Sequence, residues 1–289
     1  MRKLATLLLC AAFTLPSVAQ ELPQPSPSAT LQQRVGLTDV TVKYSRPSVK
    51  DREVFGTLVP YDELWRTGAN KATQITFSTP VNFGGEEVAA GTYSLFSIPS
   101  QAEWTVILNK ETELWGTGNF DEGKNVAVVE VQPMEAETQE SFTIDVNELR
   151  NETALLTLHW ENTKVAVPIK VKTQQKALEN IKVAIGEAKD EDKWRVYRNA
   201  ANYYFNNDID DKMALDYVNQ SIALNRDSWY SHYLQSEILA DLGSYDKAVK
   251  SASMALEMGQ AEAEAKDQEF SYNKMISEAI ADYKKKMKK

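Results

Sequence analysis

The sequence alternates apolar and polar residues in the stretch Val40-Thr41-Val42-Lys43-Tyr44. Because successive side chains of a β-strand point to opposite faces, this alternation predicts a strand with one buried face. Similar short runs, rich in β-branched and aromatic residues, recur between residues 29 and 172, with turn signals such as Gly84-Gly85 between them. Roughly nine such runs, with no helix long enough for a parallel crossover between them, predict an antiparallel β-sandwich domain over residues 29–172.

After residue 172 the apolar residues take the period of a helix. Ala214 and Val218 have the same phase as Ala248 and Ala252, which lie 34 residues further along the chain. This separation is the length of a tetratricopeptide repeat. We therefore expect an all-α tetratricopeptide-like helical repeat over residues 173–289, which makes the chain an α+β multidomain protein. Six helices in three stacked pairs are expected, near residues 174–188, 192–206, 210–224, 228–241, 245–258 and 262–286.

The N-terminus has the pattern of a secretory signal peptide over residues 1–19. Two basic residues precede an apolar run at residues 4–15, and small residues follow, so cleavage is expected between Ala19 and Gln20. The run is shorter than the roughly 20 residues of a membrane-spanning helix, and no membrane span is predicted. We expect export, periplasmic or secreted, of a chain that begins with a Pro-rich linker at residues 20–28.

Charge and residue usage exclude several kinds of site. The chain carries 32 basic and 41 acidic residues, for a net charge of -9, and an acidic protein repels the phosphates of nucleic acids, so no nucleic-acid partner is expected. The single cysteine, Cys10, lies in the signal peptide, and neither His159 nor His232 has a nucleophile motif beside it. We therefore expect no metal site, no cofactor and no catalytic triad.

Basic residues concentrate in one stretch of the β domain, residues 43–71. Guanidinium groups bind carboxylate, phosphate or sulfate through paired hydrogen bonds, and aromatic faces beside them suit a ligand held in a cleft. The sequence therefore predicts a site for an anionic small molecule or glycan, with the candidate residues Tyr44, Arg46, Arg52, Trp65, Arg66 and Asn70.

A second interpretation of the same arginines is that they brace a long connection. They would do so by binding its carbonyl groups and the neighbouring acids Asp51, Asp62 and Glu63, because backbone without regular pairing needs such donors. In that case the protein is a structural component of the cell envelope and has no ligand.

Two functional hypotheses follow from the predicted site. In the first, the β-sandwich binds a ligand or partner and the helical repeat is a scaffold for an unidentified protein partner, because stacked repeats present extended concave surfaces. The alternative is an exported hydrolase or lyase acting on an anionic carbohydrate or ester. Arg66 would then stabilise developing negative charge, and Asp62 or Glu63 would act as general base. No catalytic motif decides between them.

A series of short motifs runs through the β domain: Tyr44-Ser45-Arg46-Pro47, Arg52, Phe55-Gly56, Pro60, Trp65-Arg66-Thr67-Gly68-Ala69-Asn70, Gly91-Thr92-Tyr93-Ser94-Leu95-Phe96, Ile98-Pro99, Trp104, Asn109 and Trp115-Gly116. Together these motifs resemble a bacterial exported family known as domain of unknown function 2911. The resemblance covers roughly residues 26–170 and implies an exported domain, often followed by a tetratricopeptide-like helical segment, without any known reaction.

Overall fold

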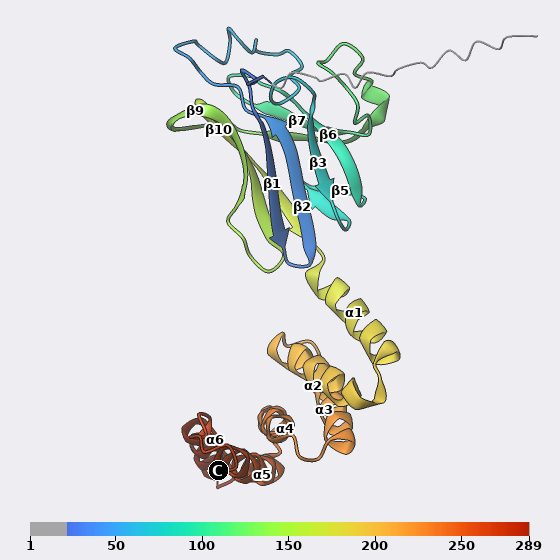
Figure 1. Ribbon diagram of the computed structural model, residues 1–289, viewed down its shortest axis with the longest axis vertical. Helices are drawn as coiled ribbons and strands as arrows, with labels where there is room; N and C mark the ends of the chain where they lie inside the picture. Colours follow the sequence, from blue (N-terminus) through green and yellow to red (C-terminus); the bar gives the residue numbers. More distant parts are fainter. Residues whose placement is uncertain (1–21, 289) are drawn as a thin grey trace, which may run out of the picture. The chain divides into compact units, whose positions relative to one another are not determined.

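The structure, a computed structural model, describes residues 22–288. The chain divides into two compact units after Thr173. The first contains antiparallel sheets and the second contains six helices, which confirms the α+β architecture (Figure 1). The signal peptide predicted at residues 1–19 lies outside the described residues.

The larger sheet has six strands in the order β1-β2-β3-β6-β7-β8, and each neighbouring pair is antiparallel. The predicted strand at residues 40–44 is the middle of β2, where Val40 and Val42 are buried and Lys43 is exposed. The strands of this sheet are β1 (Ser28–Val35), β2 (Thr38–Ser45), β3 (Thr73–Phe77), β6 (Gly91–Ile98), β7 (Trp104–Asn109) and β8 (Asn125–Val131).

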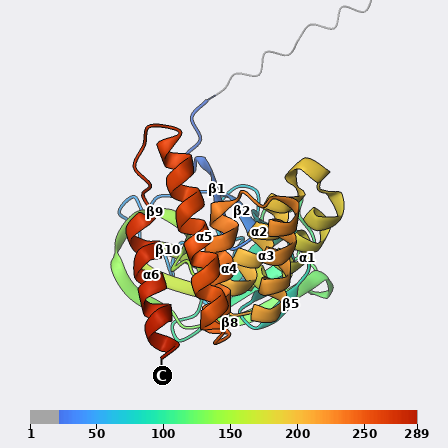
Figure 2. The ribbon, with the colours of Figure 1, turned by 90° about the horizontal axis from the view of Figure 1, so that it is seen from below.

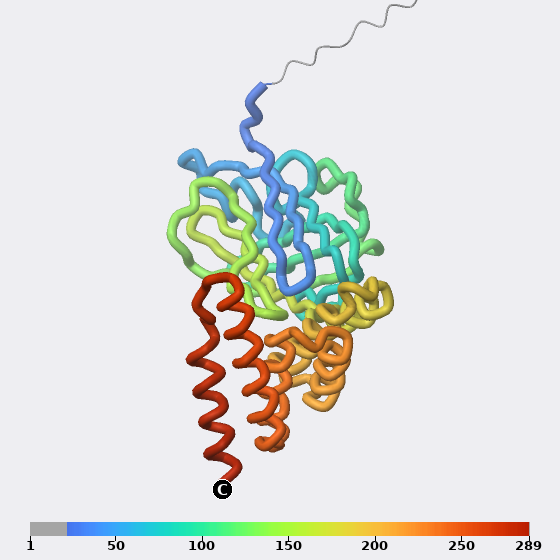
Figure 3. The backbone as a smooth tube through the Cα atoms, turned by 60° about the horizontal axis from the view of Figure 1, so that its bottom comes forward, coloured from blue at the N-terminus to red at the C-terminus, as the bar shows by residue number. Residues whose placement is uncertain are grey.

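The smaller sheet has four strands in the order β5-β4-β10-β9 and is also antiparallel. Its longest strand, β10, pairs with β9 in a hairpin whose register shifts on both sides of Glu161. Figure 3 shows this hairpin beside the hairpin of β1 and β2. The strands are β4 (Val81–Phe83), β5 (Glu86–Val88), β9 (Met134–Asn147) and β10 (Thr153–Val171).

The inner faces of the two sheets form one hydrophobic core. Val42 and Leu95 from the larger sheet and Leu156 and Ile169 from the smaller sheet are all fully buried in it. Each such side chain stabilises the fold by roughly 1.5–3 kcal/mol relative to an exposed one. The two sheets therefore pack face to face as a β-sandwich.

A second, smaller cluster covers part of the outer face of the larger sheet. Phe96 and Ile107 of the sheet pack there with Ala72 and Leu114. Leu114 belongs to the loop between β7 and β8, which ends in the short 3-10 helix η1 (Glu122–Lys124). This contact fixes the loop on the sheet.

The helical unit has six helices, as predicted, but their pairing differs. The packed neighbours are α2 with α3, α4 with α5, and α6 with α5, rather than three successive pairs that start at α1. Figure 2 shows α4, α5 and α6 next to one another. The helices are α1 (Thr173–Glu187), α2 (Asp190–Asn206), α3 (Asp211–Leu224), α4 (Trp229–Asp241), α5 (Tyr245–Glu264) and α6 (Asn273–Lys286).

One helix boundary was wrong. The sixth helix was expected from residue 262, whereas α5 continues to Glu264 and α6 begins only at Asn273. The alanine-rich end of α5 favours helix through this region, and Phe270 packs so closely on Gly259 that a side chain at Gly259 would collide with its ring.

The positions related by the 34-residue separation have equivalent places in the unit. Ala214 and Val218 of α3 and Ala248 and Ala252 of α5 are all 0% exposed. Small side chains at these positions allow neighbouring helices to approach closely. Within residues 22–288, no helix combines the length and the apolar character needed to cross a membrane.

Candidate functional site

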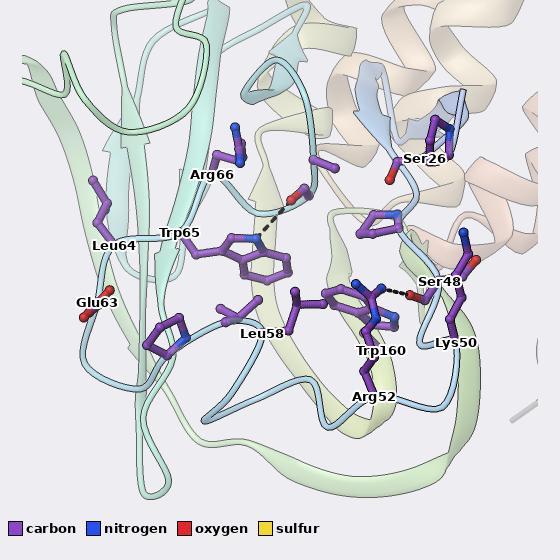
Figure 4. Close-up of a pocket in the computed structure, with 16 residues that line it drawn as sticks. Ser26, Ser48, Lys50, Arg52, Leu58, Glu63, Leu64, Trp65, Arg66 and Trp160 are labelled. Atoms are coloured by element: carbon purple, nitrogen blue, oxygen red, sulfur yellow. Dashed lines mark hydrogen bonds between the residues drawn. The ribbon is translucent and has the colours of Figure 1, made fainter. Parts of the chain in front are cut away.

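A pocket of about 330 Å³ lies in the β unit, where the connection between β2 and β3 meets the segment that precedes β1 (Figure 4). The connection, residues 46–72, contains no strand of either sheet. The pocket is lined by Pro25, Ser26, Pro47, Ser48, Lys50, Arg52, Leu58, Val59, Pro60, Glu63, Leu64, Trp65, Arg66, Gly68, Ala69 and Trp160.

Two indole rings form the apolar part of the pocket. The rings of Trp65 and Trp160 stack with centroids 5.9 Å apart at an angle of 19°. Both are buried, and both ring N–H groups donate to backbone carbonyls, Trp65 to Gly68 at 3.0 Å and Trp160 to Glu140 at 3.3 Å. Phe55 packs edge-on against both rings. These contacts hold the two indole rings in place.

The connection adopts unusual backbone conformations around the pocket. Of the nine non-glycine residues with positive φ in the described part of the chain, five lie between residues 50 and 70. Such left-handed conformations cost free energy for residues with a side chain, and they cluster at functional sites. The five are Lys50, Asp51, Asp62, Thr67 and Asn70.

Buried hydroxyl groups hold the strained turn after Trp65. The Oγ1 of Thr67 lies 2.9 Å from the Oγ of Ser97, and the Oγ1 of Thr73 donates to the carbonyl of Thr67 at 2.5 Å. All three side chains are 0% exposed. At Gly68, where φ is +147°, a Cβ would lie 3.1 Å from the carbonyl oxygen of Ser45. The turn is therefore fixed from inside the sandwich.

The structure divides the six predicted site residues into two groups of three. Arg52, Trp65 and Arg66 line the pocket. The other three do not line it and are hydrogen-bonded elsewhere in the β unit: the hydroxyl of Tyr44 donates to the carbonyl of Ile144 at 3.3 Å and accepts from its N–H at 3.2 Å.

Arg46 and Asn70 likewise join segments that are distant in sequence. The Nε of Arg46 donates to the carbonyl of Phe142 at 3.0 Å, and its Nη2 donates to the Oγ1 of Thr143 at 2.7 Å. The Nδ2 of Asn70 donates to the carbonyl of Ser26 at 3.2 Å. Part of the predicted linker at residues 20–28 is thus hydrogen-bonded to the β unit and lines the pocket.

Three cations line the pocket, from Lys50, Arg52 and Arg66. Arg52 donates to the carbonyls of Val49 at 2.9 Å and Ser48 at 2.6 Å, and Arg66 donates to the carbonyl of Asn70 at 3.1 Å. The arginines therefore brace the connection through its carbonyl groups, as the second interpretation predicts.

The acids that this interpretation also invoked do not neutralise the pocket. Among residues 22–288, the recorded ion pairs include none of the three cations. A guanidinium that binds one or two carbonyls keeps further N–H groups for a ligand. The bracing role and a binding role are therefore compatible for Arg52 and Arg66.

The two acids named as a possible general base, Asp62 and Glu63, lie at different places relative to the pocket. Glu63 is exposed at the pocket, on the opposite side of Trp65 from Arg52 and Lys50 (Figure 4). Asp62 is exposed and does not line the pocket. General acid–base work on a bound substrate usually requires a group within hydrogen-bond reach of the reacting atoms. Of the two acids named as a possible general base, Glu63 is therefore the one that shares the pocket with Arg52 and Arg66.

Several pocket residues were missed by sequence reasoning. Lys50 was visible as part of the cationic stretch, but no local pattern indicated that it would line the same pocket as the two arginines. Ser26 and Trp160 come from the N-terminal segment and from β10, and only the fold brings them to the connection.

Comparison with known proteins gives a match for most of the part of the chain that builds this pocket. No curated protein matches the chain. Residues 26–169 match the family described as Protein of unknown function (DUF2911). The match begins at the segment that lines the pocket and ends within β10. The β unit is therefore similar to the DUF2911 family, in agreement with the resemblance carried by its sequence motifs.

Proposed function

We propose that the β unit is a binding module whose pocket takes an anionic group of a small molecule or glycan. The observation that carries the proposal is the set of three cations, Lys50, Arg52 and Arg66, on one pocket without an ion-pair partner among the described residues. The chain as a whole has a net charge of -9, so a local excess of positive charge is not a by-product of composition.

The chemistry of the pocket favours carboxylate, phosphate or sulfate as the bound group. The guanidinium groups of Arg52 and Arg66 offer planar paired donors, and the amine of Lys50 adds a point charge. Three cations and one exposed carboxylate, that of Glu63, line the pocket, so the net charge of its lining is positive. A volume of about 330 Å³ is at the lower end of the range for small-molecule sites.

The proposal extends to the compartment and to the helical unit. The signal-peptide pattern at residues 1–19 supports export, periplasmic or secreted. The equal burial of positions 34 residues apart in α3 and α5 supports a tetratricopeptide-like repeat. Such repeats present surfaces for protein partners, so we assign partner binding to the helical unit.

Thermal unfolding of the purified chain with sulfate, phosphate, citrate or glucuronate tests the anion site. A ligand that binds only the folded state stabilises it by about 2.7 kcal/mol at 100 times its dissociation constant. We expect at least one of these anions to raise Tm, and Arg66→Gln together with Arg52→Gln to abolish the rise.

Lys170→Gln is the control, because Lys170 is exposed on β10 and lies ten residues beyond the pocket residue Trp160. It removes the same charge as a pocket variant and should leave the rise in Tm unchanged. The proposal is wrong if no anion raises Tm, or if Lys170→Gln abolishes the effect as the double arginine variant does.

A further inference from the structure

One tryptophan of the β unit is on the surface rather than in the core. Trp115 is 74% exposed and is the most exposed of the large hydrophobic side chains in residues 22–288. Trp65, Trp104 and Trp160 of the same unit are at most 8% exposed. An indole ring left in water loses the stabilisation that burial would give, and tryptophan is enriched at binding interfaces.

The backbone on both sides of Trp115 is fixed to the sandwich. Trp115 forms an isolated β-bridge with Lys71, and the N–H of Ala72 donates to the carbonyl of Leu114 at 3.0 Å. Leu114 is buried against the outer face of the larger sheet. The amine of Lys71 also pairs with Glu113 at 2.8 Å. The exposure of Trp115 is therefore a property of an anchored loop.

The residue after Trp115 lies close to a cation of the pocket. Gly116 has a φ of +79°, and a Cβ on it would lie 3.4 Å from the Nη1 of Arg66. The guanidinium of Arg66 therefore lies between the pocket that it lines and the loop that presents Trp115. Among the exposed large hydrophobic residues in the described part of the β unit, Trp115 is the only aromatic one, and it directly precedes Gly116 in the chain.

We propose that the ligand is an acidic oligosaccharide, in which a uronate or sulfated sugar places its charge on Arg66 and Arg52 while a neighbouring sugar ring stacks on Trp115. This inference rests on the proposed anion site. A sugar ring has one face of C–H groups that packs on an indole, while its hydroxyls stay in water. A simple inorganic or carboxylate anion gains nothing from Trp115, whereas a chain of sugars uses both features.

Isothermal titration calorimetry on the purified chain separates the two features. The probes are three acidic tetrasaccharides, from polygalacturonate, alginate and heparin, with butanetetracarboxylate as a polyanion without rings and maltotetraose as a neutral sugar chain. We expect at least one acidic tetrasaccharide to bind at least tenfold more tightly than butanetetracarboxylate, and maltotetraose not to bind.

Three variants then assign the contacts. Trp115→Ala should lower the affinity for the acidic tetrasaccharide about tenfold and leave the affinity for butanetetracarboxylate unchanged. Trp115→Phe should keep most of the affinity for the tetrasaccharide. Arg66→Gln should lower the affinity for both acidic probes. Circular dichroism of each variant checks that it is folded, and Trp115→Phe preserves an aromatic face if Trp115→Ala loses structure.

The failures of this inference and of the proposed function are distinguishable. If butanetetracarboxylate binds as tightly as every acidic tetrasaccharide and Trp115→Ala changes neither, the oligosaccharide inference is wrong and the anion site stands. If no acidic probe binds at all, the anion site itself is wrong. If Trp115→Ala and Trp115→Phe weaken butanetetracarboxylate as much as the tetrasaccharide, Trp115 shapes the pocket and does not stack on a sugar.

Discussion

Two regions of the molecule are stabilised in different ways. One is the helical unit, and the other is the pocket end of the β unit, which is the connection between β2 and β3 together with the residues that line the pocket. In α3 and α5, burial repeats every 34 residues, and the buried positions Ala214 and Ala248 are small residues with helical spacing. In the connection between β2 and β3, Arg46 bonds Phe142 and Thr143, nearly a hundred residues away, and five residues between 50 and 70 adopt left-handed conformations. The first region follows local periodicity, and the second depends on partners that only the fold supplies.

This difference teaches where each unit is sensitive to substitution. A helical hairpin built on small residues fails by overpacking, because there is no space for added atoms. The pocket end fails by loss of a large ring or a distant hydrogen-bond partner, because little regular backbone pairing supports it. The four predictions below test that contrast.

The largest effect is expected for Trp65→Ala. Trp65 is 8% exposed and packs against the rings of Phe55, Trp104, Phe142 and Trp160. Its removal should destabilise the β unit by about 3–5 kcal/mol, as for other buried aromatic side chains. Urea unfolding gives the size, and hydrogen exchange should show lost protection in β2 and β9.

Trp115→Ala is the matched control for this substitution, since Trp115 is 74% exposed. Its effect on stability should stay within about 0.5 kcal/mol. If Trp65→Ala and Trp115→Ala lowered the free energy of unfolding equally, the pocket end would not depend on its buried ring cluster.

Ala252→Leu in α5 should have the next largest effect. Ala252 is 0% exposed among neighbours from other helices, so added methylene groups should destabilise the helical unit by roughly 1–3 kcal/mol. Ala223→Leu, at an exposed position of α3, should be nearly neutral. Thermal unfolding followed by circular dichroism at 222 nm measures both, and tolerance of Ala252→Leu would show that close helix packing does not hold this unit together.

Arg46→Gln and Arg66→Gln should separate bracing from binding within the pocket end. Arg46 makes two side-chain hydrogen bonds to β9 and does not line the pocket, so its loss should cost about 1.5 kcal/mol of stability without changing anion affinity. Arg66 makes one recorded side-chain hydrogen bond and lines the pocket, so its loss should act mainly on affinity. Denaturation measures the stability of both variants, and calorimetry measures their affinity for the anion. If Arg46→Gln acted mainly on affinity and Arg66→Gln mainly on stability, the two roles would be reversed.

The smallest effect concerns pH dependence in the helical unit. Burial raises the pKa of the Glu237 carboxyl above its usual 4.5, although a hydrogen bond from Tyr233 opposes the shift. Because the folded protein holds this proton more tightly than the unfolded chain does, the stabilisation is complete below pH 4.5 and is lost as pH rises through the raised pKa.

Glu237→Gln removes this titration and keeps an oxygen for the Tyr233 hydroxyl. We expect it to raise Tm at pH 7 and to leave Tm unchanged at pH 4, as measured by calorimetry at the two pH values. An equal increase at both pH values would point to packing rather than to the charge of Glu237.

The features that sequence reasoning identified are those with local causes. Alternation at residues 40–44 predicted a strand because side-chain direction depends only on the backbone, and the 34-residue separation located the small buried positions of α3 and α5. The end of α5 was misplaced because the packing of Phe270 on Gly259 follows from tertiary contact.

The sequence likewise predicted only part of the candidate site. Charge density pointed to Arg52 and Arg66, and both line the pocket. It could not show that Tyr44 and Arg46 are bonded to β9, because their partners lie about a hundred residues away along the chain. Nor could it show that Trp160 supplies the second indole of the pocket.

The cations of the pocket belong to a chain with a net charge of -9, and this has a consequence for the kinetics of binding. An approaching anion meets a repulsive field at long range and attractive groups only within about one Debye length, roughly 8 Å in physiological salt. Added salt should therefore speed the encounter by screening the repulsion, and shorten the lifetime of the complex by weakening the final contacts. The two changes act on the affinity in opposite directions and partly cancel.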